Sequence, residues 1–201
     1  MRWQIIDSLL SGACQDISFI ADQIRIAGFL YRAVVDALRN PRHRIHITID
    51  PSVEDKALGG EYIPLPPNSN RLIFPFAKLD GNVETLASRC EAVVHECTHA
   101  CIDYTKDRVL GSEEEVASWF ADALFRRGQG LPIGGDLDFR KNFRVLADDA
   151  RESNVRGKTF RVPETALGAL EADFVHVHSK RDKTSQKAAC GWVTGSNSAY
   201  R

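Results

Sequence analysis

The feature that most constrains this chain is the pattern H-E-x-x-H at residues 95–99. It lies within residues 82–105, an apolar-periodic segment that predicts a helix with Asn82 as its N-cap. On a helix, His95 and His99 are four residues apart, so both imidazoles project from one face, one turn apart. The pattern therefore predicts a helix that presents two nitrogen ligands side by side.

Two imidazole nitrogens so placed can share one Zn²⁺ at about 2.1 Å each. Glu96 follows the first histidine and is expected beside the metal, where its carboxylate can take a proton from a bound water. Zinc lowers the pKa of that water toward about 7 and polarises a scissile carbonyl. We therefore predict a zinc-dependent hydrolase with His95 and His99 as metal ligands and Glu96 as the general base.

A catalytic zinc usually has a third protein ligand, and the next predicted helix, over residues 112–127, begins with three glutamates. Negative charge in a first turn also suits the helix dipole, which explains at least one of them. The apolar positions of this helix define a face that has Glu113 near its middle, Glu114 at its border and Glu115 opposite. Periodicity alone thus leaves Glu113 and Glu114 open as the third ligand.

The segment resembles the gluzincin branch of the zincin metallopeptidases, the thermolysin-like arrangement, in which a glutamate helix follows H-E-x-x-H. Glu114, Ser118 and Phe120 match that group's spacing of ligand, supporting polar residue and aromatic residue. Residues 114–121 are also similar to the small regulatory peptidases of the ImmA/IrrE type. The resemblance covers roughly residues 45–125. It implies Glu114 as the third zinc ligand, with Glu113 and Glu115 as the remaining alternatives, and a protein or peptide as the substrate.

The chain departs from these families at three points. Ser118 stands where an Asp or Asn is usual, the short interval between His99 and Glu114 requires a tight turn around residues 106–111, and no downstream histidine is an evident transition-state donor. Two other classes of function stay open, the first of them because of Ser118 and the missing donor. One is a regulatory or interaction protein that retains a zinc-bound zincin core with little turnover. The other is a delivered toxin metallopeptidase.

The rest of the chain predicts an α+β fold, a single, mostly helical zincin-like domain over residues 1–201. A small, partly antiparallel sheet is expected beside the H-E-x-x-H helix. The domain is expected to consist of N-terminal helices (1–42), the sheet with the metal-binding helices (43–130), and C-terminal helices with a tail (131–201). Helices are expected over residues 3–39, 136–154 and 163–174, strands over 43–49, 61–65, 71–74 and 175–178, and a loose tail over 179–201. The family resemblance implies that residues 61–65 or 71–74 form the edge strand that lines the substrate cleft.

Composition and charge argue against nucleic acids and membranes as partners. The net charge of −1 lacks the basic excess of nucleic-acid-binding proteins, and no apolar run reaches the roughly 20 residues of a membrane span. No signal peptide is recognisable, so we expect a cytoplasmic protein or one exported without such a mark. The five cysteines match no disulfide framework and are expected to be small buried apolar residues: Cys14, Cys90, Cys97, Cys101 and Cys190. Weaker site candidates, expected to be structural, are Tyr62, Tyr104, Tyr200, His43, His46, His176 and His178.

Overall fold

We describe a computed structural model of the chain. It describes residues 1–40, 45–56, 59–65, 69–105, 111–131, 138–155 and 157–181. The helices are α1 (Arg2–Leu10), α2 (Gly12–Gln15), α3 (Gly28–Arg39), α4 (Val83–Thr105), α5 (Gly111–Gly128), α6 (Asp138–Val155) and α7 (Glu164–Arg181), with a 3-10 helix over Pro51–Lys56. The strands are β1 (Ser18–Ala21), β2 (Ile24–Ala27), β3 (Ile45–Ile49), β4 (Glu61–Ile63), β5 (Asn70–Phe74) and β6 (Phe160–Arg161).

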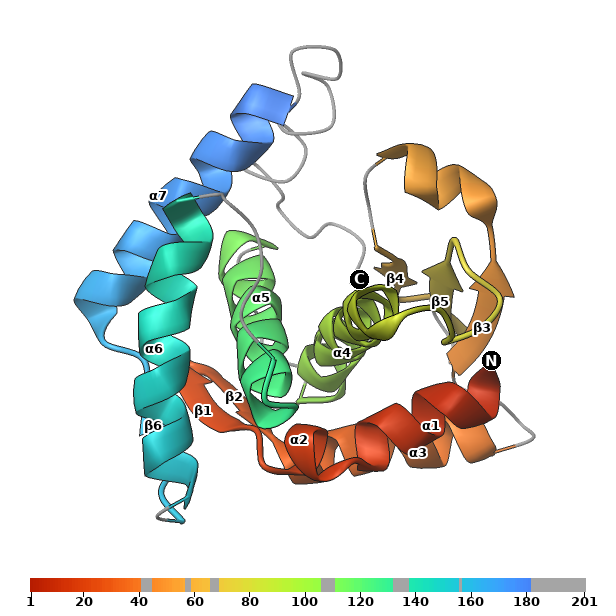
Figure 1. The fold of residues 1–201 in the computed structure, drawn as a ribbon, viewed down its shortest axis with the longest axis horizontal. Helices are drawn as coiled ribbons and strands as arrows, with labels where there is room; N and C mark the ends of the chain where they lie inside the picture. Colours follow the sequence, from red (N-terminus) through yellow and green to blue (C-terminus); the bar gives the residue numbers. More distant parts are fainter. Residues whose placement is uncertain are drawn as a thin grey trace.

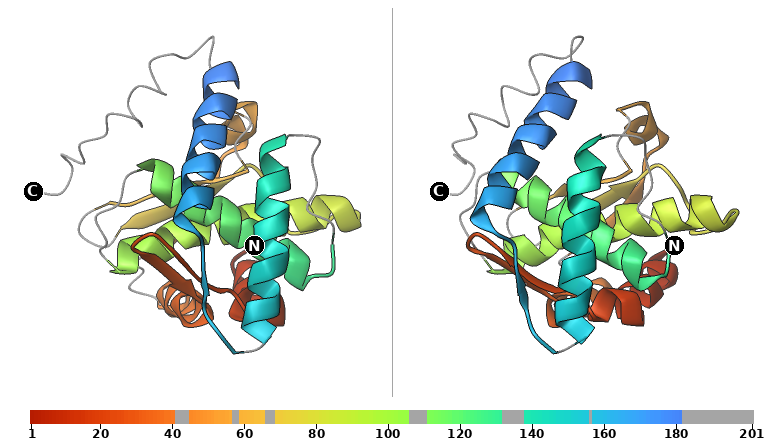
Figure 2. Two further views of the ribbon diagram at one scale, coloured as in Figure 1. Left: turned by 90° about the vertical axis from the view of Figure 1, so that its left-hand side faces the viewer. Right: turned by 60° about the vertical axis from the view of Figure 1, so that its left-hand side comes forward.

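Helices α4 and α5 pack against each other at the centre of the molecule (Figure 1). Helices α1 and α3 cover one end of this pair, and α6 and α7 pack on the far side of α5. The sheet that contains β3, β4 and β5 lies on the side of α4 away from α5 (Figure 1), and both views in Figure 2 show α6 and α7 next to each other. The predicted α+β, mostly helical fold with a small sheet beside the H-E-x-x-H helix is confirmed. None of the described helices has the length and apolarity that a bilayer crossing requires.

The predicted sheet beside α4 is present, with strand order β3-β5-β4. Strand β5 pairs in parallel with β3 and antiparallel with β4, so the sheet is partly antiparallel as expected. Strand β4 is shorter than predicted and ends at Ile63, before Pro64, which has no N–H for a ladder hydrogen bond. The central position of β5 leaves β4 at the edge. Residues 41–44 and 66–68, which include His43 and part of the segment between β4 and β5, lie outside the described part of the chain.

The prediction of helix through residues 17–27 is wrong, because this segment forms the antiparallel hairpin β1-β2. Ala21 pairs with Ile24 across a two-residue turn in which Asp22 has φ of +51°, the left-handed conformation that Asp tolerates. The buried apolar residues follow a period of two along each strand: Phe19 and Ala21 in β1, Ile24 and Ile26 in β2. Short strand β6, which was not predicted, pairs in parallel with β1 and completes a second sheet.

The C-terminal region also differs from the prediction at one point. Helix α6 occupies Asp138–Val155, close to the predicted helix. Helix α7 continues to Arg181, so the predicted strand over residues 175–178 is wrong and this segment is helical. A four-residue apolar and histidine run has too little length to separate strand from helix by its pattern. The rest of the predicted tail, 182–201, with Cys190 and Tyr200, lies outside the described residues.

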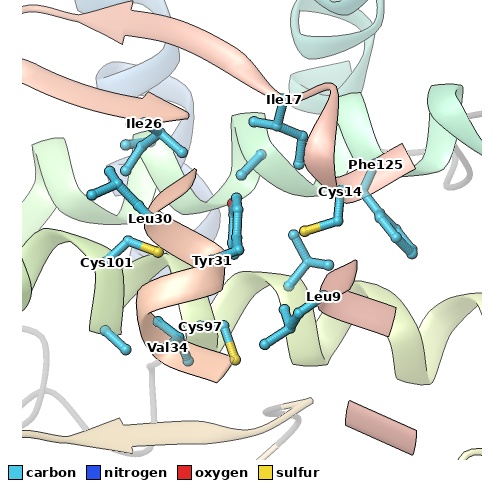
Figure 3. Packing of buried hydrophobic residues seen from close by; sticks show 14 of the residues in the cluster. Leu9, Cys14, Ile17, Ile26, Leu30, Tyr31, Val34, Cys97, Cys101 and Phe125 are labelled. Carbon is cyan, nitrogen blue, oxygen red and sulfur yellow. The ribbon is translucent and has the colours of Figure 1, made fainter. Parts of the chain in front are cut away.

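The core lies between α1–α3 and the α4-α5 pair, and cysteines contribute to it (Figure 3). Cys14, Cys97 and Cys101 are buried and free, as expected, while Cys90 is half-buried. Burial raises the pKa of all four thiols, so they remain protonated apolar groups at neutral pH. Cys97 and Cys101 therefore pack α4 into the core, on the side of the helix opposite His95 and His99.

One buried hydrogen bond also fixes α4. The Thr98 hydroxyl donates to the Val94 carbonyl at 2.8 Å, so the Tyr31 hydroxyl of α3 must donate to Thr98 Oγ1, also at 2.8 Å. We expect Tyr31→Phe to lower the free energy of unfolding by about 0.5–1.5 kcal/mol, because it removes this bond without opening a cavity. Urea denaturation measures the loss, with Phe29→Leu on the exposed face of α3 as the control. Equal stability of Tyr31→Phe and the parent would show that the bond contributes nothing.

Candidate metal centre

Helix α4 places the two motif histidines as the sequence predicts. His95 Nε2 and His99 Nε2 lie 3.2 Å apart, and the ring planes are inclined at 70°. The helix begins after Asn82, whose side-chain oxygen accepts a hydrogen bond from the Thr85 N–H at 2.9 Å, which confirms the predicted N-cap. His99 is buried, and the side chain of His95 is 12% exposed. The two Nε2 atoms therefore converge on one point of a largely buried surface.

A carboxylate from α5 faces this same point. Glu115 Oε2 lies 3.4 Å from His95 Nε2, and Glu115 Oε1 lies 3.6 Å from His99 Nε2. The ligand atoms that these three residues offer all lie within 4.8 Å of one another. Two nitrogen donors from α4 and one carboxylate from α5 thus face one another, and Glu115 follows His99 by 16 residues in the sequence. Such a donor set is suited to one metal ion.

The outer nitrogen of each ring is held by a different carboxylate. His99 Nδ1 lies 2.8 Å from Glu114 Oε1, and His95 Nδ1 lies 3.2 Å from Asp122 Oδ2. An ionised carboxylate can only accept a hydrogen bond, so each Nδ1 carries the proton and donates it. In the neutral imidazole the Nε2 atom then carries the free lone pair. Both rings are thus fixed in the orientation and tautomer that a metal ligand needs.

The three glutamates at the start of α5 diverge. Glu115 joins the two Nε2 atoms and Glu114 supports His99, whereas Glu113 lies near Glu171 of α7. The pKa of Glu171 is raised first by burial and then by the charge of Glu113. The geometry thus groups Glu115 with the histidines, in place of the Glu114 that the family resemblance implies.

The sequence placed Glu115 opposite the apolar face of α5 and therefore away from the site. This inference failed because α5 is buried on nearly all sides and has no single buried face. Ten of its residues are buried, in a nearly continuous run from Val116 to Arg126, since α2, α4, α6 and α7 all pack around it. A helix surrounded in this way can direct a charged residue into a site from the side opposite its most apolar positions. Residues 106–110, where a tight turn before α5 was expected, lie outside the described part of the chain.

The residue that supports His95 was missed by the sequence analysis. The hydroxyl of Ser118, the expected supporting group, is fully buried and has no hydrogen-bond partner among the described residues. Asp122, one turn further along α5, makes the contact to His95 instead. The available signal was the spacing from Glu115 to Asp122, seven residues or two helical turns, which places both carboxylates on one stripe. Trp119 also packs its ring edge-on against His95, with centroids 5.1 Å apart.

The buried carboxylates dominate the electrostatics. Burial alone lowers the pKa of His95, but the charge of Asp122 and its hydrogen bond outweigh burial and raise the pKa well above the ordinary value. Burial likewise lowers the pKa of His99, and the charge of Glu115 with the hydrogen bond to Glu114 raises it. The protein thus surrounds these two rings with negative charge, which favours a cation between them, whether a proton or a metal ion.

Glu96 lies at the buried side of the site. Burial raises the pKa of its carboxyl group, and the charges of the two histidines oppose that rise. A Cβ atom added to Gly60 would lie 2.8 Å from Glu96 Cγ and 2.9 Å from the Phe74 ring. Only a glycine at position 60 therefore lets the loop before β4 approach this closely. The close approach restricts the space around Glu96 from the side of the sheet.

The edge strand is tied to the end of α4. The Tyr62 hydroxyl donates to Asp103 Oδ2 at 2.7 Å, and the Asn70 amide donates to both the Tyr62 oxygen and Asp103 Oδ2. Asp103 follows His99 by one helical turn, so this network fixes the position of β4 beside the histidines. The structural role expected for Tyr62 fits this contact. His46 is exposed on β3 and does not belong to the ligand set.

No protein-family model matches this chain, and neither a curated protein nor a solved structure matches it. What the site does must therefore be inferred from its own residues.

Proposed function

We propose that the chain is a zinc-dependent hydrolase that cleaves amide bonds in a protein or peptide. The observation that carries the proposal is the convergence of three ligand atoms whose supporting residues are already in place. A tetrahedral Zn²⁺ with ligands at roughly 2.1 Å separates neighbouring ligand atoms by roughly 3.4 Å. The two Nε2 atoms are 3.2 Å apart, and each has a different Glu115 oxygen near it, at 3.4 Å from His95 and 3.6 Å from His99. With one ligand atom taken from each residue, the three atoms lie within 4.8 Å of one another, so a small movement of the Glu115 carboxylate would bring the set to the size that this ion requires.

The proposal assigns His95, His99 and Glu115 as ligands, with Glu115 in place of Glu114. A nitrogen and carboxylate set of three leaves one position open, as catalytic zinc sites do. When bound, zinc polarises a carbonyl oxygen and makes a water more acidic. Glu114 and Asp122 hold the two rings and increase their basicity through the Nδ1–H hydrogen bonds.

Glu96 is the group that moves the proton. It is adjacent to His95 in the chain and buried, and its carboxyl group interacts electrostatically with His95, His99 and Glu115, so it lies near the ligand set without belonging to it. In the proposed reaction, Glu96 takes a proton from the attacking water and delivers a proton to the leaving amine. The raised pKa that burial gives this carboxyl suits a group that must both accept and return a proton.

An extended peptide is the favoured substrate because an edge strand lies beside the site. Strand β4 pairs only with β5 among the described strands, and the Tyr62-Asp103 contact holds it next to α4. Its outer edge can accept a peptide backbone by strand addition. Of the two strands that the sequence offered for this role, β4 is therefore the one that we propose.

Metal analysis combined with chelation tests the proposed function. We expect about one zinc per purified chain, cleavage of a mixed peptide library, loss of cleavage with 1,10-phenanthroline and recovery on zinc addition. Zinc binding should also raise the melting temperature, by a stabilisation of about 2.7 kcal/mol at a free zinc concentration one hundred times Kd. Stoichiometric zinc without cleavage would favour a regulatory protein. A chain that binds no zinc would refute the metal centre altogether.

A further inference from the structure

Helices α4 and α5, which lie side by side (Figure 1), meet along a line of charged side chains that continues beyond the candidate metal centre. The contacts along this line join later residues of α5 to earlier residues of α4, so the two helices are antiparallel: Glu115 with His99, Asp122 with His95, and Arg126 with Glu91. Arg126 follows Glu115 by 11 residues, or roughly 16 Å along the helix axis. The contacts at the two ends of this line are therefore joined by three turns of a single helix.

Arg126 binds two carboxylates of α4 at the far end of this line. Its side chain is 2% exposed. Nη1 donates to Glu91 Oε2 at 2.6 Å, and Nη2 donates to Glu84 Oε1. A guanidinium group is planar and rigid, so two of its nitrogens that bind two different carboxylates fix the direction of the whole group. Glu84 and Glu91 are seven residues apart, so Arg126 spans two turns of α4.

Arg126 lies on the same stripe of α5 as the two carboxylates that face the histidines. Glu115, Asp122 and Arg126 are separated by seven and four residues, intervals that return to nearly the same direction on a helix. A rotation of α5 by about 100° that brings Glu114 to the histidines would therefore replace Arg126 with Phe125 at the surface of α4. The carboxylates of α4 would then face an apolar ring, and the buried guanidinium would be turned away from them.

The charged contacts oppose such a rotation more strongly than apolar packing does. Helix α5 is buried on nearly all sides, and burial of apolar area is non-directional, so it distinguishes weakly between two rotations. Separation of a buried guanidinium from its carboxylates is strongly unfavourable, because it leaves a charge without compensation. Buried polar and charged groups are known to fix the register of packed helices in this way.

We infer that Arg126 is a positioning residue for the metal centre. By binding Glu84 and Glu91, it fixes the rotation of α5 on α4. This rotation directs Glu115, and not Glu114, toward the two Nε2 atoms. Arg126 does not belong to the ligand set and acts through the helix that carries Glu115. The inference rests on the metal-binding part of the proposed function and requires no peptide cleavage.

The test is a comparison of zinc affinities in the full-length protein. Glu115→Gln and Glu114→Gln are each made in the parent and in Arg126→Met, and a competing chelator of known zinc affinity gives each Kd. The measured quantity is the Kd of the Glu115→Gln variant divided by that of the Glu114→Gln variant in the same background. A general loss of stability weakens zinc binding in both variants alike, so a merely structural role of Arg126 would leave this ratio unchanged.

The parent ratio is expected to exceed about ten, because only Glu115 faces both Nε2 atoms in the observed rotation. In Arg126→Met, α5 can turn and present either glutamate, so the ratio should fall about tenfold, towards one. Arg127→Met is the matched control, since it makes the same change at the next residue of the same helix. Arg127 donates to Asp148 of α6 at 2.9 Å, so its loss should keep the parent ratio.

Two conservative variants extend the test. Arg126→Lys keeps the buried charge and guards against a methionine variant that does not fold. An ammonium group lacks the planar fork that binds two carboxylates at once, so the ratio should fall here too, but by less. Glu91→Gln keeps an acceptor oxygen for Arg126, and Glu84 retains its charge, so this variant should keep a ratio close to that of the parent.

The outcomes separate the two proposals. A ratio that falls in a folded Arg126 variant and not in Arg127→Met supports the positioning role. A parent-like ratio in every folded Arg126 variant would overturn that role and leave the metal centre standing. An equal fall in Arg127→Met would also overturn it, because any loosening of α5 would then suffice. A parent chain that binds no zinc would overturn the proposed function, and the positioning role with it.

Discussion

Replacement of Glu96 by Gln is expected to lower kcat/KM for peptide cleavage by about 10²- to 10⁴-fold while the chain keeps its zinc. The amide has the shape of the carboxyl group but cannot accept the proton of the attacking water, and general-base catalysis contributes a factor of this size. Because Glu96 is not in the ligand set, His95, His99 and Glu115 remain to bind the metal. Zinc content and single-peptide kinetics measure both parts of the prediction.

The matched control is Glu91→Gln, the same change on the same helix. Glu91 accepts a hydrogen bond from Arg126 at 2.6 Å and does not belong to the ligand set. It should therefore alter stability more than turnover. Cleavage by Glu96→Gln at the parent rate would show that another group takes the proton. Loss of zinc in this variant would instead place Glu96 among the ligands.

The sequence predicted those parts of the fold in which one periodicity dominates. The segment around β3, which alternates and is rich in β-branched residues, and the long apolar-periodic segment of α4 both have the expected structure. The β1-β2 hairpin was missed because Ile17, Ile20, Ala21 and Ile24 also satisfy helical spacing. Two strands of four residues each are too short for the period of two to outweigh that coincidence. The turn at Asp22 depends on a backbone conformation that Asp only tolerates, so the sequence carried a weak turn signal.

At the site, the motif determined which residues of α4 would meet, since four residues of helix fix the relative position of His95 and His99. The contribution of α5 depends on how that helix is rotated about its axis when it packs on α4. Adjacent residues on a helix differ by about 100° in direction. A rotation of α5 by about that angle therefore exchanges Glu114 for Glu115. The role of Asp122 depends on the same orientation, and sequence alone does not supply it.

The roles of Glu114 and Glu115 can be separated by the amide substitution at each position. Glu115→Gln is expected to weaken zinc binding by more than the roughly 10- to 100-fold loss that removal of an outer-shell partner causes. A neutral amide oxygen is a poor replacement for the negatively charged ligand that the site offers between the two Nε2 atoms. Titration with a competing chelator of known zinc affinity measures Kd for each variant.

Glu114 should respond differently, because its contact is a hydrogen bond to a ligand and not a bond to the metal. Glu114→Ala removes the acceptor for the His99 Nδ1–H and should weaken zinc binding by about 10- to 100-fold. Glu114→Gln keeps an acceptor oxygen in the same place, so it should recover much of that loss. No such recovery is expected when Glu115→Gln is compared with Glu115→Ala. If the pattern were reversed, with Gln tolerated at position 115 and not at 114, Glu114 would be the ligand and α5 would face α4 in a different rotation.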